Sequence, residues 1–567
     1  MKAHDPPSRS AFLLAASLIV LILIAYAPVL RSGFIWDDDY HLTRNPCIIG
    51  PLGFKEIWTS TRAIYYPLVL TNFWVLHKVF GLNPLPYHLL NILMHGASAV
   101  LLWRVLVRLK IQGAWFGAAL WALHPVMVQS VAWITELKNT QSCFFFLLSI
   151  LFFLKGDDAR SSIAWTNESR RSFGFSLLFF AMAVASKPST VMLPFVLALC
   201  LWWRRGRWQW RNLSRLGPFI LISLVASGWT IWEQEFPGGA RGANWSQSLL
   251  ERFAIAGLDV WFYLGKIVWP HPLIFIYPRW NYTRELIAVL PALIVIGCLF
   301  FLWFKRNGFL RPLFFAAAYF VISLFPVLGF FNVYFFKYSF VSDHFQYLAS
   351  IGAFALIAAA GTRACERLFS GHIQRTLLVS ILVTLMTLTW RQVLIYEDSE
   401  TLWTKTIEEN PRAWIAHNNL SEPLLARGDF KGAAEHALVA LNLHPDYALV
   451  HNNLGLALEG LKQNDAAVKE FRRAIELDPK LPQARLNLAG QLLAEKDFDE
   501  AEQEYAQVIA TTPEFAEAHY NYAVLLAMRR RIPEALRECR AAYALTPGDP
   551  QCQWLLDILI EADNKAQ

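Results

Sequence analysis

The chain has 567 residues, of which 55% are hydrophobic and only 17% are charged, and its mean hydropathy is +0.33. Soluble globular domains carry about 25% charged residues, so this composition excludes an ordinary soluble enzyme and favours a protein that crosses a membrane several times. The net charge of +7 comes mostly from Lys and Arg between apolar runs. Charges in that position act as a topology signal, and no nucleic acid partner is expected.

The composition changes near residue 395. Up to that point the chain is apolar and aromatic, and beyond it the chain is rich in Ala, Leu, Glu and Asn. We therefore expect an all-α protein with two domains, residues 1–395 in the membrane and residues 396–567 in water.

The first domain contains about eleven apolar runs that could span a membrane. The segment 173–203 is divided at Lys187-Pro188, and because both of its ends are basic we expect it to cross twice. Residues 253–269 are amphipathic and are expected to lie on the outer surface rather than to cross. The expected spans are 11–30, 88–107, 113 to the 120s, 140–154, the two halves of 173–203, 216–232, 286–304, 312–331, 345–361 and 376–395.

Basic residues in short loops predict the orientation of these spans. Lys2 and Arg9 place the N-terminus on the cytoplasmic side, and an odd number of crossings then places residues 396–567 outside. The same assignment gathers polar residues of the first domain on the outer side, although the charge rule does not require it. Those residues are Asp37, Asp38, Asp39, His124, Glu136, Lys138, Lys187, Asp343 and His344. The gathering indicates a single extracytoplasmic site.

The second domain is repetitive. Prolines 411, 445, 479, 513 and 547, asparagines 419, 453, 487 and 521, and alanines 433, 467, 501 and 535 all recur every 34 residues. This period resembles the tetratricopeptide repeat, whose stacked helix pairs form a concave groove. Full repeats are expected at about 414–447, 448–481, 482–515 and 516–549, with a capping helix at 550–567. Within the groove Asn419, Asn453, Asn487 and Asn521 would either bind an acceptor peptide backbone or bond locally.

The aspartates that follow the first apolar run are expected at the membrane–water boundary, because carboxylates are costly in hydrocarbon. A lipid-linked phosphate substrate would present its head group at that depth. Other outer loops contribute the segment from His124 to Lys138, Lys187 beside Pro188, and Asp343-His344 through Tyr347. The structural alternatives are a solvated interfacial cap for the aspartates, a helix terminator for His124-Pro125, and a salt bridge for Asp343-His344.

Three segments resemble membrane glycosyltransferases that carry tetratricopeptide repeats, a family that in animals includes O-mannosyltransferases of the endoplasmic reticulum acting on cadherins. The segments are Trp36-Asp37-Asp38, the stretch from His124-Pro125 to Ala132-Trp133, and Ser186-Lys187. The resemblance covers nearly the whole chain and implies a GT-C fold, a polyprenyl-phosphate sugar donor and an inverting transfer. Gln129 stands where the family usually carries Glu, and Asp343-His344-Phe345-Gln346-Tyr347 stands where animal members usually have an Arg and a Tyr.

This resemblance and the chemistry of the residues suggest their roles. A hydroxyl that attacks an anomeric carbon needs a base, for which Asp37 or Asp38 is suited. The leaving lipid phosphate needs positive charge, which Lys187, Lys138 and His344 could supply. Asp39, His124, Glu136, Asp343 and Tyr347 are further active-site candidates. No cofactor is required, although Asp37 and Asp38 could instead hold a divalent metal.

The expected function is the transfer of mannose from a polyprenyl-phosphate donor to a Ser or Thr hydroxyl of a protein held by the repeats. One alternative is a non-catalytic scaffold, anchored among membrane lipids, in which only the repeats act. A second alternative is a lipid-linked glycan polymerase or ligase. We expect a bacterial inner membrane with the repeats in the periplasm; the alternative is the endoplasmic reticulum membrane with the repeats in the lumen.

Overall fold

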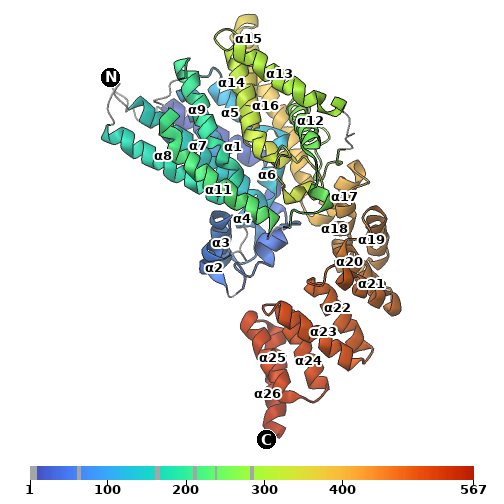
Figure 1. Ribbon diagram of the computed structural model, residues 1–567. Coiled ribbons are helices and arrows are strands. Elements are labelled where there is room, and N and C mark those ends of the chain that lie inside the picture. Colours follow the sequence, from blue (N-terminus) through green and yellow to red (C-terminus); the bar gives the residue numbers. More distant parts are fainter. Residues whose placement is uncertain are drawn as a thin grey trace. The chain divides into compact units, whose positions relative to one another are not determined.

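The computed structural model describes residues 9–50, 52–60, 66–159, 166–208, 213–236, 239–280 and 286–566 (Figure 1). Lys2, which entered the orientation argument, lies outside this range. The chain forms two compact units, one of residues 1–43 and 54–402 and the other of residues 44–53 and 403–567. All regular secondary structure in the described residues is helical.

The helices of the first unit pack both against neighbours in sequence and against helices that are distant in sequence. Helix α7 lies along both α4 and α8, α15 packs on α5 and α14, and α12 packs on α13. The helices are α1 (Arg9–Ala25), α2 (Gly53–Thr59), α3 (Pro67–Phe80), α4 (Pro84–Arg108), α5 (Ala114–Leu123), α6 (Val128–Ala132), α7 (Leu137–Asp158), α8 (Asn167–Ser186), α9 (Leu193–Arg205), α11 (Gly217–Glu235), α12 (Leu249–Val268), α13 (Leu290–Phe304), α14 (Arg311–Leu324), α15 (Ser350–Leu368) and α16 (Gly371–Val393).

Five helical segments among the described residues are long and apolar enough to cross a membrane by themselves, where about eleven were expected. They are Pro84–Arg108, Ile134–Asp158, Ser214–Glu235, Ile287–Phe304 and Gly371–Tyr396. Each of the other expected spans overlaps a helix, but several of these helices are short, such as α5 with 10 residues and α9 with 13. The amphipathic segment 253–269 corresponds to α12.

The outer face of α13 suits a lipid environment. Its side chains Phe300, Phe301 and Phe304 are 61%, 56% and 67% exposed, and only 11% of the span Ile287–Phe304 is buried inside the protein. An apolar surface of this kind is unfavourable in water, whereas a helix satisfies its own backbone hydrogen bonds in hydrocarbon.

Two prolines end helices where the site is built. A residue before proline is disfavoured in helical conformation, and proline itself has no N–H to donate. Lys187 accordingly adopts an extended backbone between α8 and the 3-10 helix η5 (Pro188–Met192). His124 does the same between α5 and the 3-10 helix η3 (Pro125–Met127). Both breaks turn the chain without a long loop.

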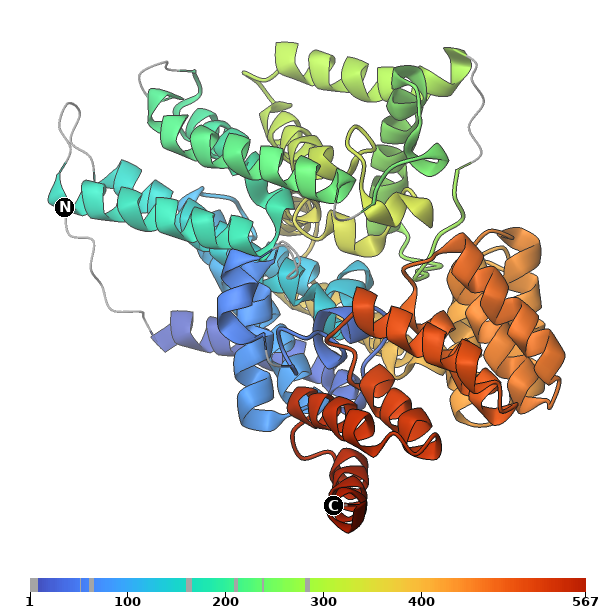
Figure 2. The same ribbon diagram turned by 60° about the horizontal axis from the view of Figure 1, so that its bottom comes forward.

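The second unit is a stack of helix pairs (Figure 2). Helices α18 and α19, α20 and α21, α22 and α23, and α24 and α25 pair in succession, and α26 packs on α25. Ala433, Ala467, Ala501 and Ala535 are completely buried, so the repeated small residue lies where helices approach closely. The helices are α17 (Ser399–Glu409), α18 (Trp414–Ala426), α19 (Phe430–Leu443), α20 (Ala448–Gly460), α21 (Asn464–Leu477), α22 (Pro482–Ala494), α23 (Phe498–Thr511), α24 (Ala516–Met528), α25 (Ile532–Leu545) and α26 (Pro550–Ala566).

Candidate functional site

A buried carboxylate with two lysines forms the centre of the candidate site. The Glu136 side chain is completely buried, Lys138 Nζ lies 2.8 Å from its Oε1, and Lys187 Nζ lies 3.5 Å from its Oε2. The Lys138 and Lys187 side chains are only 10% and 11% exposed. Because two ammonium groups share one carboxylate, these three residues carry one excess positive charge. Buried charge of this kind is costly unless it is paired, so the arrangement favours the binding of an anion.

Asn139 connects this charged cluster, defined as Glu136, Lys138 and Lys187, to the rest of the fold. Its Nδ2 donates to Glu136 Oε2 at 2.5 Å and to the carbonyl oxygen of His344 at 3.0 Å. Its Oδ1 accepts from Lys187 Nζ at 2.6 Å. A single carboxamide therefore links the start of α7, the break after α8 and the loop that contains His344.

The three consecutive aspartates have different environments. Asp38 is completely buried; its Oδ1 accepts from the N–H and O–H of Thr135 at 2.8 and 2.5 Å, and its Oδ2 accepts from the N–H of Ile35 at 2.9 Å. Asp37 keeps a side chain that is 38% exposed and lies 3.9 Å from His41. Asp39 accepts from Thr43 Oγ1 at 2.6 Å. Asp38 thus holds its loop against Thr135 through hydrogen bonds, whereas the Asp37 side chain remains partly exposed.

The surroundings also shift the pKa values of Asp37, Asp38 and Lys187. Burial raises the pKa of Asp37 to about 6, although the Lys138 charge opposes this. Burial raises the pKa of Asp38 to about 7 against the hydrogen bonds from Ile35 and Thr135. Burial lowers the pKa of Lys187 to about 8, with Glu136 acting in the opposite direction. Asp37 can therefore change its protonation close to neutral pH.

His344 is brought to the charged cluster, but as a neutral side chain. Its Nε2 lies 3.9 Å from Glu136 Oε1, and its Nδ1 lies 2.8 Å from Ser342 Oγ. Burial lowers its pKa to about 3, so at neutral pH it contributes hydrogen bonding rather than the positive charge expected from the sequence.

Two supporting residues, Asn139 and Gln129, were not assigned a role from the sequence. Gln129 Oε1 accepts from Ser342 Oγ and from the N–H of His344, both at 2.9 Å. The signal that could have found Asn139 is the polar run from Glu136 to Ser142 at the start of an otherwise apolar helix. Such residues are costly at membrane depth and therefore functional candidates.

Other sequence candidates have partners outside the charged cluster. Asp343 accepts from Tyr277 Oη at 3.1 Å, so it is not paired with its neighbour His344. His124 Nδ1 accepts from the N–H of Val126 at 3.4 Å and caps η3. Tyr347 Oη lies 2.6 Å from His95 Nδ1 in the core. These contacts fit structural roles.

Two of the repeated asparagines of the second unit bond to the asparagine that precedes the repeated position one repeat earlier. Asn453 Nδ2 donates to Asn418 Oδ1 at 3.2 Å, and Asn487 Nδ2 donates to Asn452 Oδ1 at 2.8 Å, in each case one repeat earlier. Asn419 accepts from Asn418 at 2.9 Å, while its own Nδ2 is buried without a hydrogen-bond partner. Within the described residues, Asn521 does not extend this series of hydrogen bonds. The position one repeat earlier that would accept from it is Leu486, which has no side-chain acceptor.

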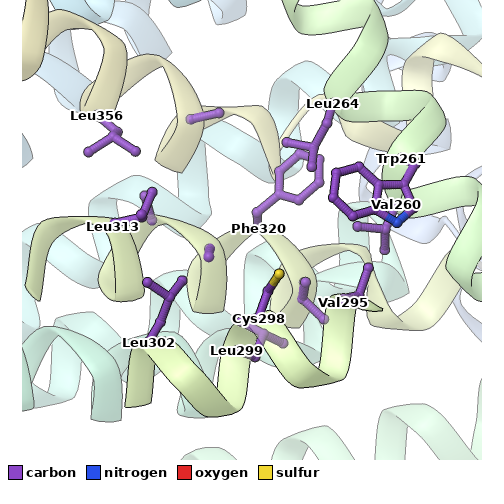
Figure 3. A pocket seen from close by; sticks show the side chains of 14 residues that line it. Val260, Trp261, Leu264, Val295, Cys298, Leu299, Leu302, Leu313, Phe320 and Leu356 are labelled. Atoms are coloured by element: carbon purple, nitrogen blue, oxygen red, sulfur yellow. The ribbon is translucent and has the colours of Figure 1, made fainter. Parts of the chain in front are cut away.

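A separate cavity of about 180 Å³ lies among α12, α13, α14 and α15 (Figure 3). Its lining is apolar apart from the Cys298 sulfur and the Trp261 ring nitrogen, and it includes Leu264, Leu299 and Phe320. It has no charged group for a phosphate. Within the described residues, no group of three or more His, Cys, Asp or Glu side chains is placed to hold a metal ion.

Comparison with known proteins identifies repeats and distant relatives. The tetratricopeptide-repeat family matches residues 396–448, 424–482, 452–512 and 486–550. The protein O-mannosyl-transferase TMTC2 of Mus musculus is 29% identical over 157 residues, which are 25% of this chain and 19% of that protein. TMTC1 of Homo sapiens is 25% identical over 508 residues, 78% of this chain and 56% of that protein. A protein O-mannosyl-transferase of Caenorhabditis elegans is 23% identical over 466 residues, 76% of this chain and 62% of that protein.

These findings define the class of protein. The chain is a helical protein with tetratricopeptide repeats at its C-terminal end, and the part of it that the structure describes contains five candidate membrane helices. It is similar to protein O-mannosyl-transferases of animals, and it spans 19% to 62% of the length of the three relatives described.

Proposed function

We propose that the protein is an inverting glycosyltransferase that moves mannose from a polyprenyl-phosphate donor to a Ser or Thr hydroxyl of a protein. The observation that carries this proposal is the charged cluster, in which Lys138 and Lys187 share Glu136 within electrostatic reach of Asp37. A cation site for a phosphate and a free carboxylate for a hydroxyl proton are the two groups that such a transfer needs.

In the proposed reaction the acceptor oxygen attacks the anomeric carbon from the side opposite the phosphate. The new C–O bond forms as the bond to the phosphate oxygen breaks, and that oxygen keeps the electron pair. The hydroxyl proton passes to Asp37. We assign the base to Asp37 rather than Asp38 because the oxygens of Asp38 already accept three hydrogen bonds. A pKa of about 6 for Asp37 suits a base that works near neutral pH.

The developing charge on the lipid phosphate would be stabilised by the excess positive charge of Lys138 and Lys187. Asn139 fixes the orientation of Lys187 through the 2.6 Å hydrogen bond. A divalent ion held between Asp37 and Asp38 would have to displace hydrogen bonds from Asp38, so we propose that the transfer proceeds without a metal.

The sugar and the acceptor class come from the relatives, whose names describe protein O-mannosyl-transferases. We propose that the repeats hold the acceptor protein, since stacked repeats form a groove for a peptide. We also propose eleven crossings, with the N-terminus inside and both the charged cluster and the repeats on the extracytoplasmic face. The bacterial inner membrane is the preferred location, and the endoplasmic reticulum is the alternative.

The test compares Asp37→Asn with the matched variant Asp39→Asn, each expressed in cells that lack the wild-type chain. Mass spectrometry of outer-compartment proteins should find O-linked hexoses with the wild type and Asp39→Asn but not with Asp37→Asn. Unchanged protein glycosylation together with shortened glycan chains would favour the polymerase or ligase. Full function of the Asp37→Asn variant would refute the proposed base and favour the scaffold.

A further inference from the structure

Five aromatic side chains form an aromatic cluster beside the charged cluster. The rings of Trp36 and Trp133 stack with their centres 5.5 Å apart and their planes 17° apart. Phe275, Phe335 and Tyr338 approach the Trp36 ring edge-on, at 5.4, 6.3 and 5.7 Å between centres. Trp36 immediately precedes Asp37, the proposed base, in the sequence.

The aromatic and charged clusters share a boundary at Trp133. Lys138 Nζ lies 5.4 Å from the centre of the Trp133 ring, and the His344 ring lies 6.0 Å from it. Any ligand whose phosphate is held by Lys138 would therefore bring the group attached to that phosphate close to these rings.

The backbone at Trp36 is strained. Its φ is +42°, a value that bulky residues rarely adopt and that persists only where the surroundings impose it. Ile35 and Asp38 flank this residue, and the N–H of Ile35 donates to the Asp38 carboxylate, which holds the turn. The same carboxylate also accepts from the N–H of Thr135. The buried Asp38 thereby fixes the position of the Trp36 ring as well as that of Asp37.

Two buried donors at this boundary have no partner. Trp133 and Gln129 are each only 1% exposed, and both Trp133 Nε1 and Gln129 Nε2 lack a hydrogen bond. The oxygen of Gln129 is occupied by Ser342 and His344, so only its amide N–H groups remain. Unsatisfied buried donors are costly, and ligand hydroxyls would satisfy them.

Aromatic faces combined with unpaired N–H donors match the chemistry of a pyranose ring. A hexose presents apolar C–H faces that pack on aromatic rings and a rim of hydroxyl oxygens that accept hydrogen bonds. A phosphate uses the charged cluster and gains little from indole rings. We propose that Trp36, Trp133 and Gln129 form the subsite for the sugar of the donor; this inference rests on the proposed function.

The experiment measures binding by the purified full-length chain in detergent of two probes, polyprenyl-phosphate mannose and polyprenyl phosphate without sugar. Trp36→Leu removes the partly buried partner of the stack, Trp36→Phe keeps an aromatic ring, and Trp229→Leu is a control at a 55% exposed position on α11. Trp36→Leu should weaken binding of the mannosyl lipid by about tenfold and leave that of polyprenyl phosphate unchanged. Trp36→Phe should lie between the wild type and Trp36→Leu, and Trp229→Leu should match the wild type.

Gln129→Met provides an independent variant, because it keeps the length of the side chain and removes its N–H donors. It also removes the oxygen that accepts from Ser342 and His344, so its unfolding temperature is compared with that of the wild type. Gln129→Met should also weaken binding of the mannosyl lipid selectively. Equal losses for both lipids would assign the aromatic cluster to the phosphate or the prenyl chain, and unchanged binding of both would reduce it to a packing role. The binding assay does not depend on sugar transfer. A failure of the proposed function in the Asp37→Asn test can therefore be distinguished from a failure of the proposed sugar subsite.

Discussion

Asp37 and Asp38 are neighbours in the chain but differ in what their carboxylates contact. The oxygens of Asp38 are surrounded by the donors of Ile35 and Thr135, whereas the side chain of Asp37 retains open surface. Isosteric replacement by Asn removes the charge from either residue and keeps its shape, so the two substitutions should have different consequences.

We predict that Asp38→Asn destabilises the protein, whereas Asp37→Asn inactivates it. An amide offers only one acceptor oxygen, so in Asp38→Asn its NH₂ would face an N–H of Ile35 or Thr135, at a cost of about 1–3 kcal/mol. Asp37→Asn should lower the transfer rate about 100-fold or more, the usual contribution of a general base, with little change in unfolding temperature. Thermal unfolding and transfer assays on the same preparations separate these effects. Equal unfolding temperatures for both variants would contradict the structural role of Asp38.

We predict that the transfer rate depends on pH through Asp37 and Lys187. Asp37 must be ionised to accept a proton, so the rate should rise as pH increases through about 6, the pKa of Asp37. Lys187 must be protonated to stabilise the phosphate, so the rate should fall as pH increases through about 8, the pKa of Lys187. The profile of kcat/KM against pH should be bell-shaped between these values. Lys187→Arg should remove the descending limb, since Arg remains protonated; a limb that persists in this variant belongs to another group.

The sequence predicts some residues of this site and not others. The charge rule assigned Glu136, Lys138, Lys187 and His344 to one side of the membrane, and the structure brings these four side chains together. Sequence alone could not tell that Asp38 turns inward and Asp37 outward, because that depends on Thr135, 97 positions away along the chain. It also could not assign Asn139, whose partners lie on three separate segments.

At the scale of elements, local sequence predicts where helices end better than how far they extend. The breaks at His124-Pro125 and Lys187-Pro188 follow from the geometry that proline imposes on the preceding residue. The 34-residue period likewise follows from the spacing of small residues that must be buried. The short helix α3 was not expected, because its 14 residues are interrupted by polar side chains and lack a membrane-length apolar run.

The repeats also contain a cross-helix pair whose chemistry changes along the array. His451 Nδ1 lies 2.6 Å from Glu470 Oε2, and His519 Nδ1 lies 2.8 Å from Glu538 Oε2, each joining the two helices of one repeat. In the first repeat the equivalent position is a second histidine, and His417 Nδ1 lies 2.9 Å from His436 Nδ1. The first repeat therefore has two bases where later repeats have a base and an acid.

We predict that His436→Glu stabilises the first repeat selectively in acid. Burial lowers the pKa of His417 below its ordinary value, so in the wild type this group costs stability as pH falls below about 6.5. The hydrogen bond that His451 donates to Glu470 raises the pKa of His451, so that pair is fully stabilising below about pH 6.5 and weakens as pH rises. His436→Glu should therefore gain roughly 0.5 kcal/mol more at pH 5.5 than at pH 8.

Hydrogen exchange of α18 and α19 in the full-length chain measures this effect locally. The reciprocal variant Glu470→His introduces a histidine pair into the second repeat and should make α20 and α21 exchange faster in acid. If both variants change protection equally at pH 5.5 and pH 8, the pairs do not titrate in the predicted way.

At the scale of the whole molecule, the contacts of the site restrict how the chain crosses the membrane. Asp38 is hydrogen-bonded to Thr135, and Asn139 to Lys187, so each pair lies at one depth. A site at one membrane surface then requires an even number of crossings between the members of each pair. Of the five long spans only Pro84–Arg108 lies between Asp38 and Thr135, and only Ile134–Asp158 separates Asn139 from Lys187. One further crossing is needed in each interval; α5 is the short apolar helix in the first interval, and α8 lies in the second.

We predict that the first helix, α1, also crosses the membrane, which puts Asp37 on the extracytoplasmic face. In the eleven-span topology Tyr40 is outside and Gln112 inside, whereas crossing by only the five long spans reverses both positions. Five native cysteines are buried, so replacing Cys298 and Cys365 leaves a background for single reporters. A membrane-impermeant maleimide added to intact cells or right-side-out vesicles should label Tyr40→Cys, and should label Gln112→Cys only after permeabilisation. Glu495→Cys in the repeats is outside in both topologies and controls for reagent access. Labelling of Gln112→Cys but not Tyr40→Cys in sealed vesicles would contradict a crossing by α1, and with it an extracytoplasmic position for Asp37.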